Sequence, residues 1–216
     1  GCPLIVDEAH GAHFGFDPYF PKSANIYGAD LVINSLHKTL PALTQTALLH
    51  VNGDMVKRRK VKQYLDMLQT SSPSYILMAS IDACIGMLEE TLETHSDARP
   101  DYKYKNIFSE YANRIEALRK DLKRLKYLKI IQTDNTDRYD RSKFVISVKH
   151  APMSSHELYE ILLHRYHLQM EMLAGTYVLA MTTVGDTQEG LDRLRDALLE
   201  IDKEIDTKQG RPAAIE

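Results

Sequence analysis

The stretch "LIVDEAHGAHFG", residues 4–15, places an apolar run directly before two acidic side chains. Its first three residues, Leu4 to Val6, are apolar without alternation, which predicts a short parallel strand covered on both faces. Asp7 and Glu8 come at the end of this strand and are followed by an alanine and a histidine. In open α/β sheets the carboxyl ends of strands carry the ligand-binding groups, so the stretch predicts a ligand site in an α/β fold.

Two unrelated classes of protein carry almost these letters. In an ATP-driven helicase of the Asp-Glu-Ala-His type, the first acid of such a strand end lies at the magnesium ion of the nucleotide. In an enzyme that uses pyridoxal 5'-phosphate (PLP), an aspartate at a strand end meets the pyridinium nitrogen of the cofactor. The four letters alone do not distinguish these classes.

The composition excludes some partners. The chain has 216 residues, of which 44% are hydrophobic, and can bury the core of one or two units. Its 27 basic and 30 acidic residues give a net charge of −3, which does not indicate a nucleic-acid-binding surface. The basic cluster at 56–62 is interpreted as the solvated face of a helix. No apolar stretch approaches the about 20 residues of a membrane-spanning helix, so we expect neither nucleic acid nor membrane as a partner.

The cysteines and histidines do not indicate a metal site. Cys2 and Cys84 lie far apart and match no metal or redox spacing, which is typical of reduced thiols in a cytoplasmic protein. His10 and His13 lie with Asp7 on one short loop, too close together for a structural zinc site. We therefore expect no metal.

Further strands and helices follow the opening stretch. Gly28 to Asp30 mark a turn into a second strand at 31–33, after which come Ser35, His37 and Lys38. The expected elements after these are a strand within 44–51, a helix capped by Asp54 and ending near Leu68, a break at 70–74, and a helix from about Tyr75 to Thr94. The alternation of strands and helices predicts an α/β sheet.

The second half of the chain has a different pattern. A charged stretch at 93–105, with Pro100 near its middle, predicts a boundary between one domain at 1–104 and another at 105–216. The second domain is expected to be a small α+β domain with an antiparallel sheet, built from strands at 128–133, 143–148 and 177–184. Its helices are indicated by a stripe of Ile115, Leu118, Leu122 and Leu125 and by capping boxes at Ser154/Glu157 and Asp186/Glu189.

The sequence after the opening stretch distinguishes the two classes. The Ser-Ala-Thr and arginine-glycine motifs of a helicase do not follow at the expected distance, and the phosphate loop is absent. Instead Lys38 comes 31 residues after Asp7, directly after the next predicted parallel strand. Neighbouring parallel strands end at the same edge of a sheet, so an acid and an amine are expected in one crevice.

This pair has a known use in PLP chemistry. A lysine amine condenses with the cofactor aldehyde as a Schiff base, and a carboxylate keeps the pyridine nitrogen protonated, so that the ring accepts electrons. Ser35 and His37 flank Lys38 and can donate hydrogen bonds to a phosphate. These residues alone would serve an aminotransferase or an acyltransferase of the same fold equally well.

Four stretches carry a family resemblance. "PLIVDEAHGAHF", "GADLVINSLHKTLPALTQTALLHV", "TSSPSYILMAS" and "YVLAMTTVGDT" resemble the Orn/Lys/Arg decarboxylases, fold type I PLP enzymes that convert basic amino acids to diamines or agmatine. The resemblance implies the C-terminal half of a PLP-dependent transferase-like large domain followed by a small α+β domain. It also implies a cytoplasmic lyase of polyamine biosynthesis, which acts on arginine, lysine or ornithine.

The resemblance also implies roles for individual residues. Asp7 would pair with the pyridine nitrogen, Ala9 would pack under the ring, His10 would approach the phenolic oxygen, Lys38 would form the Schiff base, and Ser35 and His37 would lie near the phosphate. Thr70 would reach the phosphate of a neighbouring subunit's cofactor, so we expect at least a dimer with shared active sites. Because the family's upstream half is not in this sequence, the chain is expected to be a fragment that is itself inactive. The remaining alternatives are a helicase fragment and a catalytically silent dimerisation module.

Overall fold

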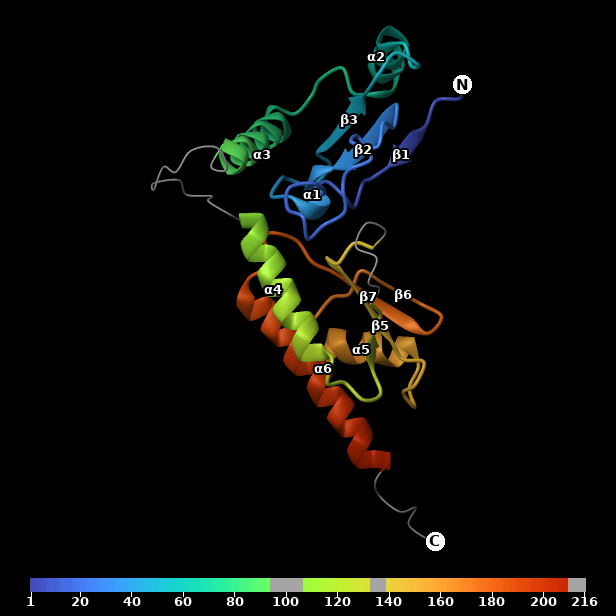
Figure 1. Ribbon diagram of the computed structural model, residues 1–216, viewed down its shortest axis with the longest axis vertical. Helices are drawn as coiled ribbons and strands as arrows, with labels where there is room; N and C mark the ends of the chain where they lie inside the picture. The colour runs from blue at the N-terminus through green and yellow to red at the C-terminus, as the bar shows by residue number, and fades with distance from the viewer. Residues whose placement is uncertain (94–106, 133–138, 210–216) are drawn as a thin grey trace. The chain divides into compact units, whose positions relative to one another are not determined.

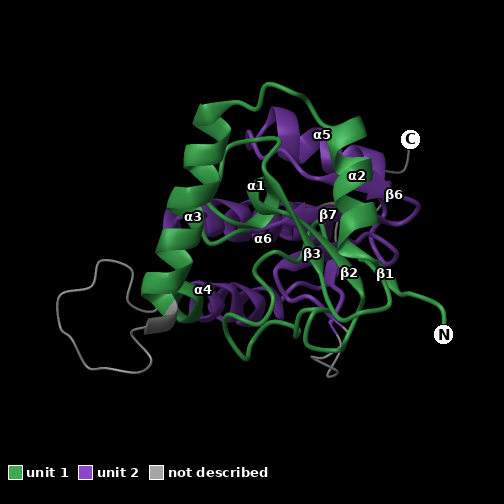
Figure 2. Cartoon of the chain, turned by 90° about the horizontal axis from the view of Figure 1, so that it is seen from above, with its two compact units in different colours: residues 1–110, 183–185 green, residues 111–182, 186–216 purple. Residues whose placement is uncertain are grey.

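The structure is a computed structural model that describes residues 1–93, 107–132 and 139–209. It divides into two compact units, shown in Figures 1 and 2: unit 1 comprises residues 1–110 and 183–185, and unit 2 comprises residues 111–182 and 186–216. Unit 1 contains both strands and helices, which agrees with the predicted α/β class. The predicted domain boundary at 104/105, with Pro100, lies outside the described residues and stays a prediction.

Unit 1 contains a three-stranded sheet with the order β1-β2-β3 (Figure 1). Strand β1 (Ile5–Asp7) pairs in parallel with β2 (Leu31–Ser35), with Asp7 opposite Ile33. Strand β3 (Ala47–Val51) pairs antiparallel with β2. The parallel pairing of the first two predicted strands is therefore confirmed.

The sheet of unit 1 is covered on one face better than on the other. Val32 and Asn34 of β2 are buried, whereas Ile33 between them is exposed, because successive side chains of a strand point to opposite faces. Leu4 and Ile5 are 55% and 59% exposed. The prediction that the opening strand is covered on both faces is thus wrong for the described chain, which leaves one face of the sheet open.

The helices of unit 1 follow the predicted order with one correction. They are α1 (Leu36–Thr39), α2 (Arg58–Leu68), α3 (Tyr75–Glu93) and the first turn of α4 (Ile107–Leu122). The expected cap of α2 at Asp54 is wrong, because the helix begins four residues later and its N-cap is Lys57, which makes no side-chain cap hydrogen bond. The guanidinium of Arg58 instead donates to the carbonyl of Val51 (2.8 Å), which fixes the start of the helix at the end of β3.

Unit 2 contains a four-stranded antiparallel sheet with the order β4-β5-β7-β6. Its strands are β4 (Lys129–Ile130), β5 (Lys143–Ser147), β6 (Met172–Ala174) and β7 (Tyr177–Met181). The predicted antiparallel sheet is confirmed, and the three predicted segments are β4, β5 and β7. Strand β6 was not predicted, because three residues are too few to show an alternating pattern.

The helices of unit 2 are α4, α5 (Ser155–His164) and α6 (Gln188–Gln209). The capping box of Ser154 and Glu157 is confirmed, since each side chain accepts the other residue's backbone N–H. The box predicted at Asp186 is displaced by one residue: α6 begins at Gln188, and the hydroxyl of Thr187 accepts the N–H of Gly190 (3.1 Å). The predicted apolar stripe is buried: Ile115, Leu118 and Leu122 lie in α4, and Leu125 follows its end.

Candidate active site

Two of the predicted site residues belong to segments that leave the sheet of unit 1 at the same edge. Asp7 is the last residue of β1, and α1, which carries Lys38, begins directly after β2. Because β1 and β2 are parallel neighbours, both chain segments leave the sheet at its carboxyl edge. The fold therefore brings the acid and the amine to one edge, as ligand sites of open α/β sheets require.

Asp7 has one carboxylate oxygen without a partner. Its Oδ1 accepts the backbone N–H of Ala9 (3.0 Å), which closes a tight turn at the strand end. Oδ2 has no hydrogen-bond partner within the described ranges, and the side chain is exposed. Ala9 and the exposed His10 follow directly, so three of the predicted site residues lie on this turn.

Lys38 lies half-buried on the single turn of α1. Its ammonium group forms no hydrogen bond or ion pair with the described part of the chain. Ser35, the N-cap of α1, makes no side-chain cap hydrogen bond, so its hydroxyl is not used by the helix. The hydroxyl of Thr39, which follows Lys38 in the chain, is buried and has no hydrogen-bond partner among the described residues. These are groups that a bound polar molecule could engage.

His37 is held by the loop before β3. Its Nδ1 lies 2.9 Å from the carbonyl oxygen of Thr46, which also accepts the N–H of Leu36 (3.1 Å). Because a carbonyl can only accept, Nδ1 carries the proton, and Nε2 of the neutral ring is an acceptor. His37 can therefore donate a hydrogen bond to a phosphate only when its imidazole is protonated.

Thr70 is not brought to this edge within the chain. Strand β3 runs antiparallel to β2, so its last residue, Val51, lies opposite Leu31 at the other edge of the sheet. The connection between α2 and α3, which contains Thr70, follows from there (Figure 1). The Thr70 hydroxyl accepts the N–H of Ser72 (3.2 Å) in a local turn.

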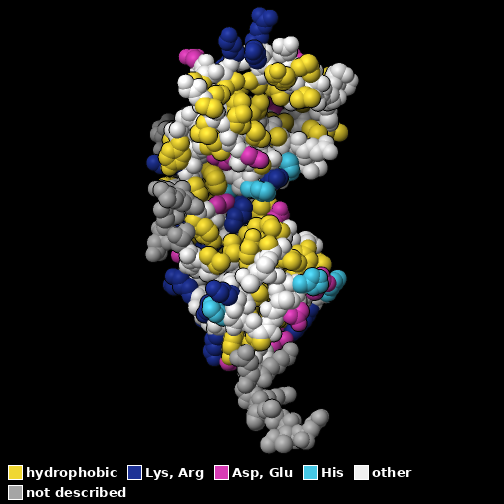
Figure 3. All heavy atoms as spheres, turned by 90° about the vertical axis from the view of Figure 1, so that its right-hand side faces the viewer, with side chains coloured by type: hydrophobic (Ala, Val, Ile, Leu, Met, Phe, Trp, Pro, Cys, Tyr) yellow, Lys and Arg dark blue, Asp and Glu magenta, His cyan; other side chains and the backbone are white. Residues whose placement is uncertain are grey.

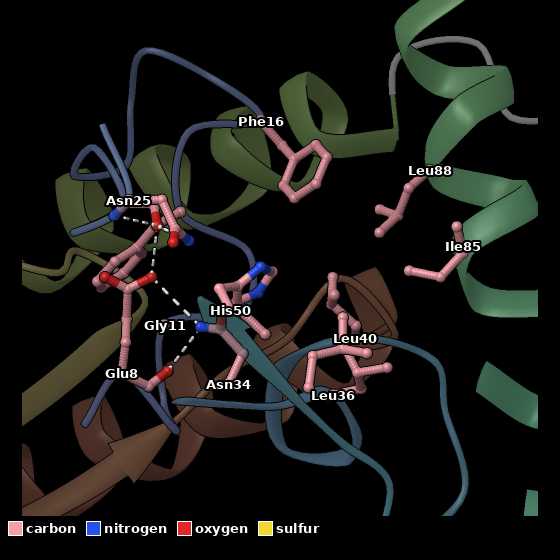
Figure 4. A pocket seen from close by; sticks show the side chains of 14 residues that line it. Glu8, Gly11, Phe16, Asn25, Asn34, Leu36, Leu40, His50, Ile85 and Leu88 are labelled. Atoms are coloured by element: carbon pink, nitrogen blue, oxygen red, sulfur yellow. Dashed lines mark hydrogen bonds between the residues drawn. The ribbon is translucent and has the colours of Figure 1, made fainter. Parts of the chain in front are cut away.

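A further residue, Glu8, was not predicted to have a role. Its side chain is nearly buried and accepts hydrogen bonds from Ser23, Ala24 and Asn34. It also lines a cavity of about 230 Å³, together with Asn25, His50 and apolar side chains of α1 and α3 (Figure 4). The only local signal is its place beside Asp7, because its partners lie 15 to 26 residues away in sequence.

The described residues form neither a metal site nor a membrane-spanning helix. Across residues 1–93, 107–132 and 139–209, no group of three His, Cys, Asp or Glu side chains is arranged to hold a metal ion. Within the same ranges, no helix is both long and apolar enough to cross a membrane.

Comparison with known proteins identifies the family. A family model described as "Orn/Lys/Arg decarboxylase, major domain" matches residues 1–169, which is well over half of the chain. The chain belongs to the Orn/Lys/Arg decarboxylase family. This result excludes the helicase alternative, because the Asp-Glu-Ala-His letters here are part of a decarboxylase-family domain.

The relatives include arginine decarboxylases. The arginine decarboxylase of Bacillus subtilis is 32% identical over 203 residues, which are 94% of this chain and 40% of that protein. The arginine decarboxylase of Bacillus anthracis is 30% identical over 222 residues, covering 99% of this chain and 42% of that protein. The chain thus spans about two fifths of the length of these relatives.

Solved structures support the fold. The lysine decarboxylase LdcF of Francisella novicida matches with a TM-score of 0.71 at 16% identity, over 94% of this chain and 33% of that chain. The serine palmitoyltransferase of Sphingomonas wittichii matches with a TM-score of 0.65 at 14% identity, over 96% and 49%. The fold is therefore that of the fold type I PLP enzymes, as predicted.

Proposed function

We propose that the full-length protein is a PLP-dependent lyase that decarboxylates a basic amino acid. The observation that carries the proposal is the parallel pairing of β1 and β2, which places Asp7, with an unengaged Oδ2, and the unpaired amine of Lys38 at one edge of the sheet. Membership of the Orn/Lys/Arg decarboxylase family supports the choice of reaction.

The available groups fit the cofactor. Lys38 offers an amine that no described residue engages, which is what attachment of an aldehyde requires. Asp7 offers a carboxylate oxygen that can hold a proton on the pyridine nitrogen. Bound PLP supplies an electron-accepting ring that stabilises the charge left on the substrate when its carboxylate leaves as carbon dioxide.

The other predicted residues would bind and orient the cofactor. Ala9, which would pack under the ring, and His10, which would approach its phenolic oxygen, both lie on the turn that follows Asp7. Ser35 and His37 would lie near the phosphate, to which the Ser35 hydroxyl could donate a hydrogen bond.

The substrate is arginine, lysine or ornithine. Curated relatives named arginine decarboxylase and solved structures named lysine decarboxylase support this class. Agmatine or a diamine would be the product, consistent with a cytoplasmic enzyme of polyamine biosynthesis.

The function is tested on the full-length protein. Titration with PLP should produce a saturable visible-range absorbance, and borohydride reduction should trap the cofactor on the peptide that contains Lys38. Carbon dioxide release is then measured from arginine, lysine and ornithine in turn. Release of a 2-oxo acid in place of carbon dioxide would assign the protein to the aminotransferases and contradict the proposal.

The proposal includes a dimer with shared sites. β3 ends at the edge of the sheet opposite to Lys38, and the Thr70 segment follows from there after α2. A position away from Lys38 of the same chain supports a role at a partner's cofactor. Mixing the Lys38→Ala protein with the Thr70→Ala protein should restore one intact site in each heterodimer of a two-fold assembly. Continued inactivity after demonstrated subunit exchange would contradict sharing in trans.

A further inference from the structure

The carboxylate of Glu8 gathers hydrogen bonds from two separate segments of unit 1. The Ser23 hydroxyl donates to Oε1 (2.8 Å), and the backbone N–H of Ala24 donates to Oε2 (2.7 Å). The amide of Asn34 also donates to Oε1 (3.3 Å). With the side chain nearly buried, both oxygens are engaged by donors, so the carboxylate is fully integrated into this part of the fold.

Asn34 connects Glu8 to the second strand of the site. It is a buried residue of β2, one position before Ser35. Its amide donates both to the backbone carbonyl of Glu8 (3.0 Å) and to the Glu8 carboxylate. Together with the hydrogen bond from Glu8 N–H to Ile33 carbonyl (2.9 Å), these contacts tie the end of β1 to the end of β2.

These hydrogen bonds lie on the face of the sheet opposite to the candidate site. Successive side chains of an extended strand point to opposite faces, so Glu8 and Asn34 lie on the face opposite to Asp7 and Ser35. The burial agrees, since Asp7 is exposed whereas Glu8 is buried. Glu8 therefore can fix the position of Asp7 without touching anything bound beside it.

Gly11 shows how closely the chain packs over Glu8. A Cβ atom at Gly11 would lie 2.7 Å from Cγ of Glu8 and 2.6 Å from the ring of Phe14. These distances are shorter than real Cβ contacts, so only glycine lets the turn pass here with Glu8 in place. The turn that carries Ala9 and His10 is thus closed directly onto the Glu8 side chain.

The hydrogen bonds extend from Glu8 into the loop between β1 and β2. Ser23 also accepts from the side-chain amide of Asn25 (3.0 Å), and Asn25 accepts from Asn52 (2.7 Å), which follows β3 (Figure 4 shows the Glu8 end). The loop is consequently held by side chains that start at Glu8 and end beyond the third strand.

We propose that Glu8, with Asn34, is a positioning residue that fixes the Asp7 turn relative to the segment of Lys38 and thereby sets the affinity for PLP. This inference rests on the proposed function. Glu8 acts only through Asp7, Ala9 and His10. Asp7 and Lys38 come from two different strands and must contact the same cofactor. Small displacements of either side chain would lose the productive geometry, so their segments need such support.

The main test compares Glu8→Ala with the wild type in the full-length protein. Glu8→Ala removes the acceptor of the Ala24 N–H and of the Ser23 hydroxyl, whereas the Asn34 amide keeps the backbone carbonyl of residue 8. The loss should loosen the turn and raise the Kd for PLP about ten-fold. Hydrogen–deuterium exchange at the Ala24 amide should become faster, which reports on the turn independently of activity. Borohydride trapping should still label the Lys38 peptide, because the amine itself is unchanged.

Two further variants keep the test decisive if Glu8→Ala folds poorly. Glu8→Gln retains one acceptor oxygen but presents an N–H₂ group to the donors on the other side, so its Kd should lie between those of wild type and Glu8→Ala. Gly11→Ala forces a methyl group against Glu8 and should reproduce the same loss with Glu8 still present. In a double-mutant cycle, the combined effect of Glu8→Ala and Asn34→Ala on the free energy of PLP binding should be clearly smaller than the sum of the two single effects.

Asp202→Asn is the matched control. Asp202 is also a buried carboxylate and accepts three backbone N–H groups, from Lys126, Tyr127 and Leu128, but it belongs to unit 2. This variant should lower the thermal stability of the protein while the Kd for PLP stays at the wild-type value.

The outcomes separate this inference from the proposed function. If wild-type protein binds no PLP, both proposals are overturned. If wild-type protein binds PLP and Glu8→Gln and Glu8→Ala bind it equally well, only the positioning role is overturned. Equal losses of affinity in the Glu8 variants and in Asp202→Asn would likewise overturn it, because the effect would then be general destabilisation.

Discussion

Units 1 and 2 differ in how completely each buries its own apolar side chains. Leu128, Phe144 and Leu158 of unit 2 are fully buried. In unit 1, helix α2 buries no residue, and its last residue, Leu68, is 83% exposed. Figure 3 shows hydrophobic side chains gathered on the surface of the part formed by unit 1, where the exposed large side chains include Leu4, Ile5, Ile26, Tyr27, Tyr64, Met67, Tyr75 and Ile76.

The difference shows that one chain can combine a unit with a fully buried core and a unit with much exposed apolar surface. Extended exposed apolar surface marks regions that other protein surface covers. Unit 2 has a core of fully buried side chains, whereas unit 1 carries the candidate site and most of the exposed large apolar side chains. We therefore expect substitutions in unit 1 to change ligand binding and assembly, and substitutions in unit 2 to change stability.

The largest effect is expected at Lys38. In the full-length protein, Lys38→Ala should abolish both turnover and borohydride trapping, because no equivalent amine follows β2 at the site edge. The thermal unfolding of unit 2 should be unchanged. The matched control is Lys22→Ala, which removes an exposed lysine of unit 1. Trapping of PLP on any other lysine would contradict the assignment.

The next effect is expected at Asp7. Asp7→Asn should leave PLP bound but lower decarboxylation by about a hundred-fold or more, the scale typical of a lost proton-holding group. The neutral amide cannot hold a proton on the pyridine nitrogen. Steady-state kinetics at saturating PLP measures the loss, and near-normal kcat would remove Asp7 from the mechanism.

The packing contrast is tested by two leucine truncations on helices. Leu162 of α5 is fully buried, and Leu162→Ala should lower the free energy of unfolding by about 2–5 kcal/mol through the lost contacts and the cavity. Leu68→Ala in α2 should change it by less than about 0.5 kcal/mol. Urea denaturation measures both, and equal effects would show that α2 is packed in solution.

A smaller effect is expected at the helix caps. Ser154→Ala removes the capping box of α5 and should cost about 1 kcal/mol. Helix α2 has no side-chain cap, so Lys57→Ser should stabilise that helix by about 0.5 kcal/mol or more. Urea denaturation measures the free energy of unfolding of both variants. A decrease for Ser154→Ala and an increase for Lys57→Ser would support the comparison, whereas a decrease in both would contradict it.

The smallest effect concerns pH. Hydrogen bonds from the Lys126 ammonium and the Tyr127 hydroxyl hold the pKa of Asp206 below its usual value. The resulting stabilisation is present above the usual pKa of an aspartate and is lost as the pH falls below about 4. Asp206→Asn should therefore flatten the decline of unfolding temperature between neutral and acidic pH. A variant curve parallel to the wild type would contradict this role.

Local patterns were sufficient for much of the fold. The two strands that carry Asp7 and precede Lys38, the end of α2 at Leu68 and the capping box at Ser154 all followed from neighbouring residues. Each depends on interactions within a few positions of the chain, such as the apolar run of a strand or a side chain that caps its own helix. The placement of Asp7 and Lys38 at one edge followed from the parallel order of neighbouring strands.

Other features could not be read from local patterns. Asp54 was a plausible cap, but α2 starts later because Arg58 is anchored to the end of β3. Leu4 and Ile5 indicated a strand covered on both faces, yet whether a face is covered depends on elements elsewhere in the protein. The site roles of all seven residues stay predictions: Asp7, Ala9, His10, Ser35, His37, Lys38 and Thr70.

The sequence by itself thus determined which residues offer an acid and an amine, and in which order their strands occur. Only the tertiary structure decided which of the two adjacent acids is buried and hydrogen-bonded by other segments. Asp7 and Glu8 are neighbours with the same functional group, but Glu8 is surrounded by donors from Ser23, Ala24 and Asn34, while one oxygen of Asp7 has no partner among the described residues. The physical reason is that alternating strand geometry turns the two carboxylates to opposite faces, and the partners of the buried one come from distant parts of the chain.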